Sequence, residues 1–204
     1  MYTPDIYKNE DPESIKTFLR ENSFGILINQ TNGKLCATHI PIELEINEEG
    51  KEILHGHISK LNPQAEGFTE NDQVLAVFSG PHSYISSSWY DHENVPTWNY
   101  IAVHVYGRIK IVNEDATAEQ LKKLVDKYEA HSENPVRVEN LSDKTMRQVK
   151  GIFGFEIEID EIQATKKLSQ NRDEHNYKNI ISELEKTKNP EAIAVAKEMS
   201  KCRK

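Results

Sequence analysis

Residues 24–46 read FGILINQTNGKLCATHIPIELEI and decide the fold. The first part, Phe24 to Asn29, is a short apolar run that is typical of a β-strand. Asn32-Gly33 follows it, and this pair supplies the positive φ angles that a tight hairpin turn needs. We therefore expect a second strand, Leu35 to Ile46, to run antiparallel to the first.

Later strand patterns extend this hairpin into a meander. They are residues 52–58, 74–78, 101–112 and 153–159. The apolar run 74–78 stops at Gly80-Pro81, and the last pattern alternates apolar with acidic residues. Because six strands occur without regular alternation with helices, the sequence predicts an α+β fold, an antiparallel barrel with helices packed outside.

Helical patterns flank these strands. They cover roughly residues 12–22, 116–131, 142–151, 173–188 and 190–201. We expect residues 1–164 to form the barrel with its inserted helices. Residues 165–204 are expected to form a basic loop and C-terminal helices that pack on the barrel.

Charge and length limit the classes of function. The chain has 204 residues and a formal net charge of −8, with 25 Lys+Arg against 33 Asp+Glu. Residues 165–204 hold ten basic and six acidic residues, a net charge of +4, which leaves −12 on residues 1–164. Net acidity opposes non-specific nucleic-acid binding, because that affinity comes mostly from Lys and Arg. Only the basic tail keeps DNA open as a partner.

The sequence also predicts where the protein resides. No apolar run approaches the roughly 20 residues of a membrane-spanning helix, so we expect no membrane insertion. The N-terminal residues lack a secretory pattern, which favours a cytoplasmic protein. Cys36 and Cys202 are expected to be free thiols in that reducing compartment.

Two polar, basic clusters are candidates for binding an anion. Ser59, Lys60 and Asn62 follow the third strand, where a hydroxyl, an ammonium and an amide can hold a phosphate. The second cluster runs from Lys166 to Arg172, just before a helix start near Asp173. Either cluster is also compatible with an ordinary solvated loop.

The histidines and aromatic residues concentrate in the strands. His55 and His57 share one strand face but lack the further ligand of a zinc site. Seven of the sixteen aromatic residues lie between Phe78 and Tyr106, which suits a flat heteroaromatic ligand, an oligomer interface or simple core packing. No Gly-x-Ser-x-Gly motif is present, so hydrolysis is disfavoured.

Eight short motifs occur in order along almost the whole chain. They are Met1-Tyr2-Thr3-Pro4, Ala37-Thr38-His39-Ile40-Pro41, Gly56-His57-Ile58 with Asn62-Pro63, Phe78-Ser79-Gly80-Pro81, Tyr84-Ile85-Ser86-Ser87-Ser88-Trp89-Tyr90, Val95-Pro96-Thr97-Trp98-Asn99-Tyr100, Val103-His104-Val105-Tyr106-Gly107 and Lys167-Leu168-Ser169-Gln170-Asn171-Arg172. Together they resemble the PaiB-like family of FMN-binding negative transcriptional regulators. The sequence departs from that family at Ser87, where Pro is usual, and at Ser59-Lys60-Leu61, where Ala-Arg-Ala is commoner.

The resemblance implies a six-stranded, FMN-binding split barrel that acts as a homodimer with flavin at the subunit interface. By position, Thr38, His39 and Ile40 would approach the flavin ring, while Ser59, Lys60 and Asn62 would meet the phosphate. His57 is a further cofactor-binding candidate. The residues that could complete the pocket, from the same or the other subunit, are Trp98, Asn99, Lys167, Gln170 and Asn171. Catalytic residues are not implied, and a redox enzyme and a flavin sensor both stay open.

Two other functions compete with flavin binding. The family name describes repression of transcription, for which the basic tail is the one candidate DNA contact. A barrel that has lost its cofactor and acts as an interaction module is the third alternative, motivated by the changed phosphate-loop residues.

Overall fold

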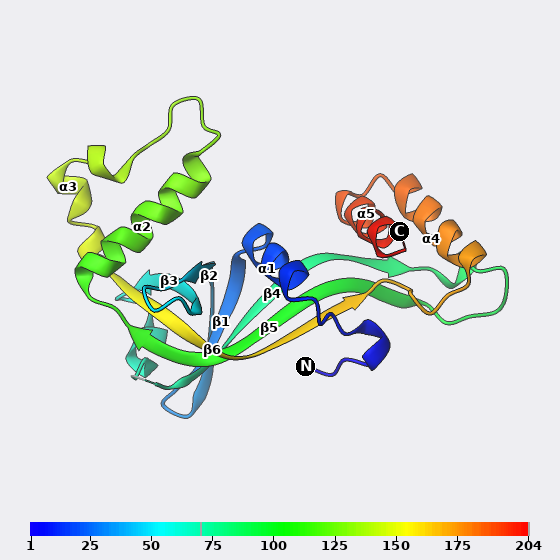
Figure 1. Cartoon of the computed structure of the whole chain (residues 1–204), viewed down its shortest axis with the longest axis horizontal. Helices are drawn as coiled ribbons and strands as arrows, with labels where there is room; N and C mark the ends of the chain where they lie inside the picture. The colour runs from blue at the N-terminus through cyan, green and yellow to red at the C-terminus, as the bar shows by residue number, and fades with distance from the viewer. Residues whose placement is uncertain (70, 204) are drawn as a thin grey trace. The chain divides into compact units, whose positions relative to one another are not determined.

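The computed structural model describes residues 1–69 and 71–203. Its strands are β1 (Phe24–Thr31), β2 (Lys34–Ile46), β3 (Glu52–Ser59), β4 (Gln73–Ile85), β5 (Thr97–Ile111) and β6 (Ile152–Lys167). Its α-helices are α1 (Pro12–Glu21), α2 (Glu114–Glu129), α3 (Asp143–Met146), α4 (Glu174–Lys186) and α5 (Pro190–Cys202) (Figure 1). Short 3-10 turns connect several of them, among them η2 (Pro63–Gly67).

The six strands form a closed barrel in the order β1-β2-β3-β6-β5-β4. The hairpin predicted from the sequence is present, with Phe24 opposite Pro41 and Thr31 opposite Lys34. At its turn, Asn32 and Gly33 have φ angles of 50° and 76°, the left-handed region that this turn requires. The predicted antiparallel barrel with flanking helices is therefore confirmed.

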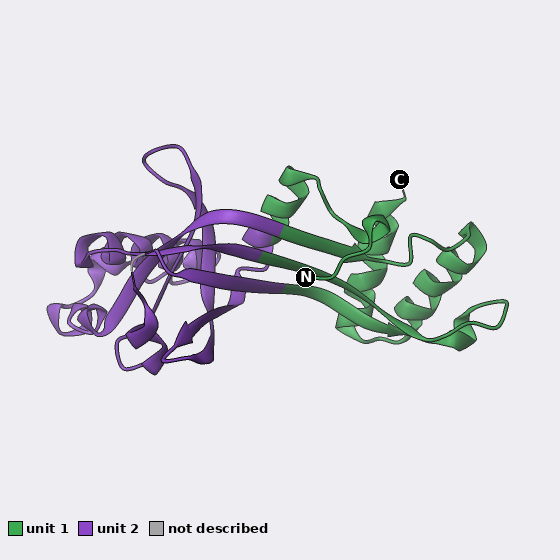
Figure 2. Ribbon diagram, turned by 90° about the horizontal axis from the view of Figure 1, so that it is seen from below, with its two compact units in different colours: residues 1–18, 79–104, 163–204 green, residues 19–78, 105–162 purple. Residues whose placement is uncertain are grey.

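The chain divides into two compact units (Figure 2). Unit 1 comprises residues 1–18, 79–104 and 163–204, and unit 2 comprises residues 19–78 and 105–162. The long strands β4, β5 and β6 each contribute residues to both units. The predicted basic segment 165–204 falls within unit 1, and the domain division near residue 164 stays a prediction.

Unit 2 has an apolar core built from alternate residues of its strands. The fully buried members of this core are Leu27, Ile42, Leu54, Phe78 and Phe155. Alternate residues of a strand point to the same face, as this pattern requires. Glycine permits two close approaches within this core. An added Cβ at position 25 or position 56 would lie 3.0 Å from the ring of Phe78 or Phe155, respectively.

Unit 1 is held together by the helical hairpin of α4 and α5. Ile180, Leu184 and Val195 are fully buried between elements of this unit. The Tyr177 hydroxyl donates a hydrogen bond of 2.6 Å to the Met199 carbonyl and so joins the two helices. Burial raises the pKa of Tyr177 to about 12, which keeps this donor protonated at physiological pH.

Two strands are longer than the sequence pattern indicates. β4 continues past Gly80-Pro81 to Ile85, and β6 continues to Lys167, so Lys166 and Lys167 lie in a strand and not in a loop. Pro81 is tolerated because the pairing of β4 with β1 covers only Leu75–Val77, and beyond it no ladder amide is required on that side.

The helix expected over residues 142–151 was also wrong in extent. Only Asp143–Met146 is α-helical, and a 3-10 turn at Val149–Gly151 follows. The chain then enters β6 at once, so no room remains for a longer helix. Among the residues described, no helix combines the length and the apolar character needed to cross a bilayer.

Candidate functional site

In unit 2, a hydrogen-bonded cluster joins β2 to the turn after β3. The Asn62 amide donates to the Thr38 hydroxyl at 2.9 Å, and that hydroxyl donates to the Gln64 side chain. Asn62 also caps η2 by accepting a hydrogen bond of 3.0 Å from the backbone amide of Gln64. Gln64 is buried and donates to the Leu27 carbonyl at 3.0 Å, which ties the turn to the barrel wall. The structure thus brings Thr38 and Asn62 together, and their contact with flavin stays a prediction.

Ser59 is the exposed last residue of β3, and Lys60 follows it at the start of the turn. The Lys60 backbone amide donates to the Gly151 carbonyl at 2.8 Å, which fixes the start of the turn. The Lys60 ammonium lies 3.8 Å from the nearest Glu114 carboxylate oxygen, and both side chains are exposed. Since this separation exceeds a normal hydrogen bond, the ammonium keeps its donors for another acceptor.

The remaining predicted residues of unit 2 differ in how they meet solvent. His39 is exposed on β2, and its ring stacks with Phe24 at a centroid distance of 6.3 Å. His57 is half-buried, and burial lowers its pKa, so its imidazole is neutral at pH 7. Ile40 belongs to the core, so its side chain is largely covered, and it lies opposite Gly25 in the β1–β2 pairing.

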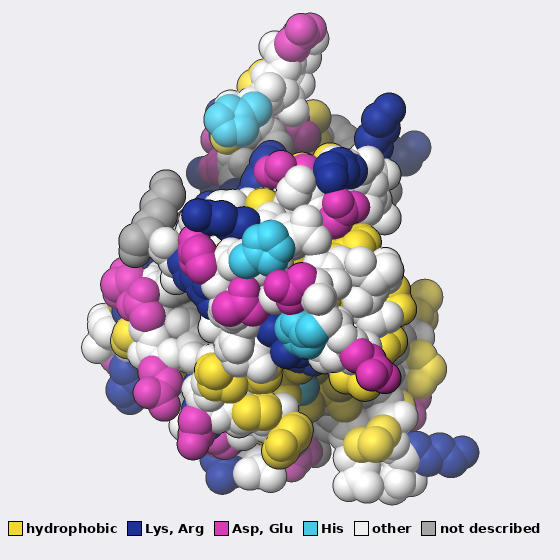
Figure 3. Space-filling model, turned by 90° about the vertical axis from the view of Figure 1, so that its right-hand side faces the viewer, with side chains coloured by type: hydrophobic (Ala, Val, Ile, Leu, Met, Phe, Trp, Pro, Cys, Tyr) yellow, Lys and Arg dark blue, Asp and Glu magenta, His cyan; other side chains and the backbone are white. Residues whose placement is uncertain are grey.

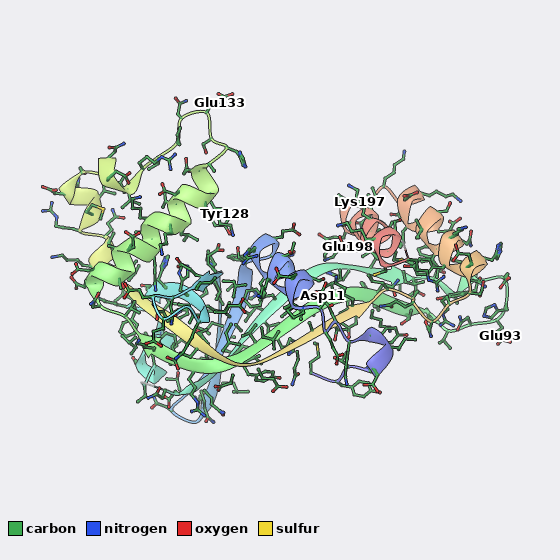
Figure 4. All side chains as sticks on the ribbon, viewed as in Figure 1. Asp11, Glu93, Tyr128, Glu133, Lys197 and Glu198 are labelled. Carbon is green, nitrogen blue, oxygen red and sulfur yellow. The ribbon has the colours of Figure 1, made fainter. Side chains whose placement is uncertain are left out.

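A polar network centred on the buried Glu43 fastens α2 to β2. The Lys127 ammonium donates to Glu43 at 2.6 Å, and the Tyr128 hydroxyl donates to the same carboxylate at 3.1 Å. Tyr128 lies near the C-terminal end of α2 (Figure 4). On the next strand, the His55 ring lies 3.2 Å from Glu45, yet burial outweighs this carboxylate and lowers the pKa of His55. This network holds the helix, and its groups are already paired.

In unit 1, the predicted residues Trp98 and Asn99 have opposite environments. Trp98 is 53% exposed and lies between His82 and Tyr84, at centroid distances of 6.2 and 6.1 Å. Asn99 is fully buried and accepts a hydrogen bond of 3.1 Å from the Ser169 hydroxyl. Asn99 therefore anchors the segment after β6, whereas Trp98 presents its ring to the surface.

The segment after β6 is tied mainly to itself. The Gln170 side chain accepts from the Leu168 backbone amide at 2.7 Å and donates to the Lys166 carbonyl. Lys167 donates to the Thr97 hydroxyl at 2.6 Å. Asn171 is exposed. Of these predicted residues, Gln170 and Lys167 already have partners within unit 1, and their ligand role stays a prediction.

Four basic residues of the C-terminal tail, Lys178, Lys186, Lys201 and Arg203, are paired with acids of the same tail. Glu174 is paired with Lys178 at 3.0 Å and with Arg203 at 3.1 Å, and Glu183 is paired with Lys186 at 2.6 Å. In the space-filling view, basic and acidic side chains alternate among the described residues of the face drawn (Figure 3). These ion pairs neutralise part of the tail's positive charge and so reduce what remains for contacts with DNA phosphates.

Two residues with structural roles at these clusters were missed from the sequence. Gln64 bridges Thr38 and Leu27, and Ser169, which has a φ of 60°, reaches Asn99. The Asn62-Pro63 pair marks the start of a turn and could have indicated Gln64 as a capped residue. Within residues 1–69 and 71–203, no three His, Cys, Asp or Glu side chains are grouped as metal ligands.

Comparison with solved structures assigns this fold to a class. The flavocytochrome Anf3 of Azotobacter vinelandii has a TM-score of 0.63 at 19% identity, covering 85% of this chain and 75% of that one. The FAD and heme binding protein of Mycobacterium smegmatis has a TM-score of 0.60 at 15% identity, covering 79% and 73%. The fold is that of the flavin-binding split barrels.

Sequence comparison identifies the family within that class. The family described as "Putative FMN-binding domain" matches residues 1–161. "Protease synthase and sporulation protein PAI 2" of Bacillus subtilis is 45% identical over 200 residues, covering 98% of this chain and 96% of that protein. The chain therefore belongs to the PaiB-like family of FMN-binding split-barrel proteins. A protein of Emericella nidulans, AN0679, is 28% identical over 91% of this chain and 90% of its own length.

Proposed function

We propose that the chain binds FMN with its phosphate at the end of β3 in unit 2 and acts as a flavin-dependent redox protein or sensor. The observation that carries the proposal is the exposed Lys60 ammonium beside Ser59, at the start of a turn that Asn62 ties to β2. A hydroxyl and an ammonium that keep their donors are suited to a phosphate dianion. The family membership supports FMN as the particular flavin.

The donor set of unit 2 fits the rest of the cofactor. Thr38 and His57 are polar groups beside the proposed phosphate site, and the His39 ring stacks with Phe24 at an exposed surface. A neutral imidazole can donate or accept a hydrogen bond to a flavin heteroatom, and the lowered pKa of His57 keeps that ring neutral. When bound, the flavin supplies the hydride or electron transfer, and the chain supplies position and electrostatics.

The same proposal includes a homodimer in the cytoplasm. Trp98 and Asn171 are exposed in unit 1, and both stay candidates for binding flavin. An indirect role is proposed for Asn99, Gln170 and Lys167. Their hydrogen bonds hold the end of β6 and the residues that follow it in place. A repressor role through DNA gains no support from the partly neutralised charges of the tail.

Flavin titration tests the proposal. Purified chain should quench FMN fluorescence at micromolar concentration, and riboflavin, which lacks the phosphate, should bind more weakly. Absence of FMN binding would leave the cofactor-free interaction module as the better function. Equal affinity for FMN and riboflavin would instead remove the phosphate site at Lys60 while keeping the flavin.

A further inference from the structure

A hollow of about 480 Å³ opens in unit 2 between the turn that joins β2 to β3 and the N-terminal half of α2. Residues 46–49 form one wall and α2 contributes residues from Asp115 to Lys123. Lys110 of β5 and Glu156 of β6 also belong to the lining. We call this space the acidic hollow. Its lining includes none of the residues proposed above to bind FMN.

The lining of the acidic hollow carries an excess of negative charge. Six acidic side chains and two lysines line it. One of these lysines, Lys123, is already paired with Glu45. With the residues that the structure describes, Asp115, Glu119 and Glu156 form no ion pair. A concave surface lined by one sign of charge attracts the opposite sign, so the hollow favours a cation and disfavours the phosphate of FMN.

Gln120 gives the acidic hollow an acceptor that has no donor. This residue of α2 belongs to the lining, and only 9% of its surface is exposed. Its side-chain oxygen Oε1 is buried and has no hydrogen-bond partner among the described residues. Leaving a buried amide oxygen without a donor costs free energy, and most buried polar atoms in folded proteins are paired. A bound N–H group would supply the missing donor.

The acceptors and the apolar side chains of the hollow define the chemical class of its ligand. Gln120 Oε1 and the half-buried Glu156 carboxylate both accept hydrogen bonds. Guanidinium and primary ammonium groups combine a positive charge with several N–H donors, so they suit both acceptors. Ile46 and Ile53 also line the hollow and offer apolar surface to a short alkyl chain. The lining therefore fits an organic cation.

We propose that the acidic hollow binds a small organic cation that carries a guanidinium or primary ammonium group. The cationic group donates hydrogen bonds to Gln120 Oε1 and to the Glu156 carboxylate, and its alkyl part lies against Ile46 and Ile53. The inference goes beyond the proposed function, because neither the hollow nor its acceptors require flavin. Binding also stabilises the folded chain, since these acceptors come together only when α2 packs beside β6.

Isothermal titration calorimetry of the full chain with agmatine, which carries both cationic groups, tests the inference. Gln120→Met removes the acceptor at similar size, and Glu156→Gln removes the charge. Each should raise the dissociation constant about tenfold, the usual effect of losing a charge-assisted hydrogen bond. The matched control is Glu158→Gln, because Glu158 is an exposed acid on the same strand outside the lining, and it should leave the affinity unchanged.

Three further probes identify the group that binds. Butylguanidinium and butylammonium each carry one of the two cationic groups of agmatine, so the tighter of them names the preferred one. Tetramethylammonium carries the charge without an N–H donor and should bind more weakly than either.

Each outcome of these titrations decides the inference. Agmatine binding that is weakened in Gln120→Met and Glu156→Gln but kept in Glu158→Gln supports it. Absence of binding to the wild-type chain overturns it, as does unchanged affinity in both hollow variants. Tetramethylammonium that binds as tightly as butylammonium overturns the hydrogen bond to Gln120. Circular dichroism shows whether each variant is folded, and Glu156→Gln alone decides if Gln120→Met does not fold.

Discussion

Lys60 and Glu114 approach each other to 3.8 Å without forming a short hydrogen bond, at the end of β3 and the first turn of α2. Glu114 belongs to a helix N-terminus, where a carboxylate is stabilised by the helix dipole. The pair therefore places a loosely held cation where the phosphate of FMN is proposed to bind. Both members can be changed without disturbing the core, since both are exposed.

Lys60→Ala should weaken FMN binding by about 1–3 kcal/mol, the usual cost of losing a charged hydrogen-bond partner. Fluorescence titration measures the dissociation constant. Lys51→Ala is the control, because Lys51 is an exposed lysine at the start of β3 that pairs with Glu49 at 2.8 Å. Equal FMN affinity in wild type and Lys60→Ala would remove Lys60 from the site.

Glu114→Gln should strengthen FMN binding by about threefold, because a competing negative charge is removed at a solvent-screened distance. The gain should shrink in high salt, since exposed charges are screened. Glu133→Gln removes another acid in the loop after α2 and should leave the affinity unchanged (Figure 4). A weaker affinity in Glu114→Gln would mean that Glu114 positions Lys60 instead of competing for it.

Asn99→Ala should destabilise the chain by about 1–3 kcal/mol, because the Ser169 hydroxyl is left buried without its acceptor. Urea unfolding measures the loss. The double variant with Ser169→Ala should be little worse than either single variant, since both remove the same hydrogen bond. Fully additive losses would show that the two residues stabilise the fold independently.

Protonation of Asp173 should destabilise the folded chain at acidic pH. Its pKa is lowered from 3.8 to about 2, above all by the hydrogen bond that it accepts from the Asn176 backbone amide at the start of α4. A lowered folded-state pKa gives stability that is complete above 3.8 and lost as the pH falls through 2. Asp173→Asn keeps an N-cap acceptor without the charge. The stability difference between wild type and this variant should therefore shrink below pH 3.8, and a constant difference would contradict the linkage.

Turn residues and the alternation of apolar residues made the barrel predictable from the sequence. The lengths of its strands were not predictable, because they depend on pairing with strands that are distant in the sequence. The Asn32-Gly33 turn and the alternation around it specify the first hairpin without further information. The extension of β4 past Pro81 could not be read locally, because it depends on where β1 stops pairing. β6 likewise extends further than its local pattern indicates, to Lys167, through residues whose sequence is typical of a loop.

The candidate site was predictable in part for the same reason. Ser59, Lys60 and Asn62 are close in sequence, so their common location follows from the end of one strand. The bond from Asn62 to Thr38 spans 24 positions and depends on strand pairing. Burial of Asn99 depends on α5 and on Ser169, and no local pattern marks it as a structural residue.

Asn62 joins two parts of the chain before any ligand arrives, because the same amide caps η2 and holds the Thr38 hydroxyl. A loop that is already ordered loses little conformational entropy when it takes up an anion. The free energy of the phosphate contacts then goes into affinity instead of into folding the turn. Association should accordingly be a single fast phase, without a slow step of loop closure.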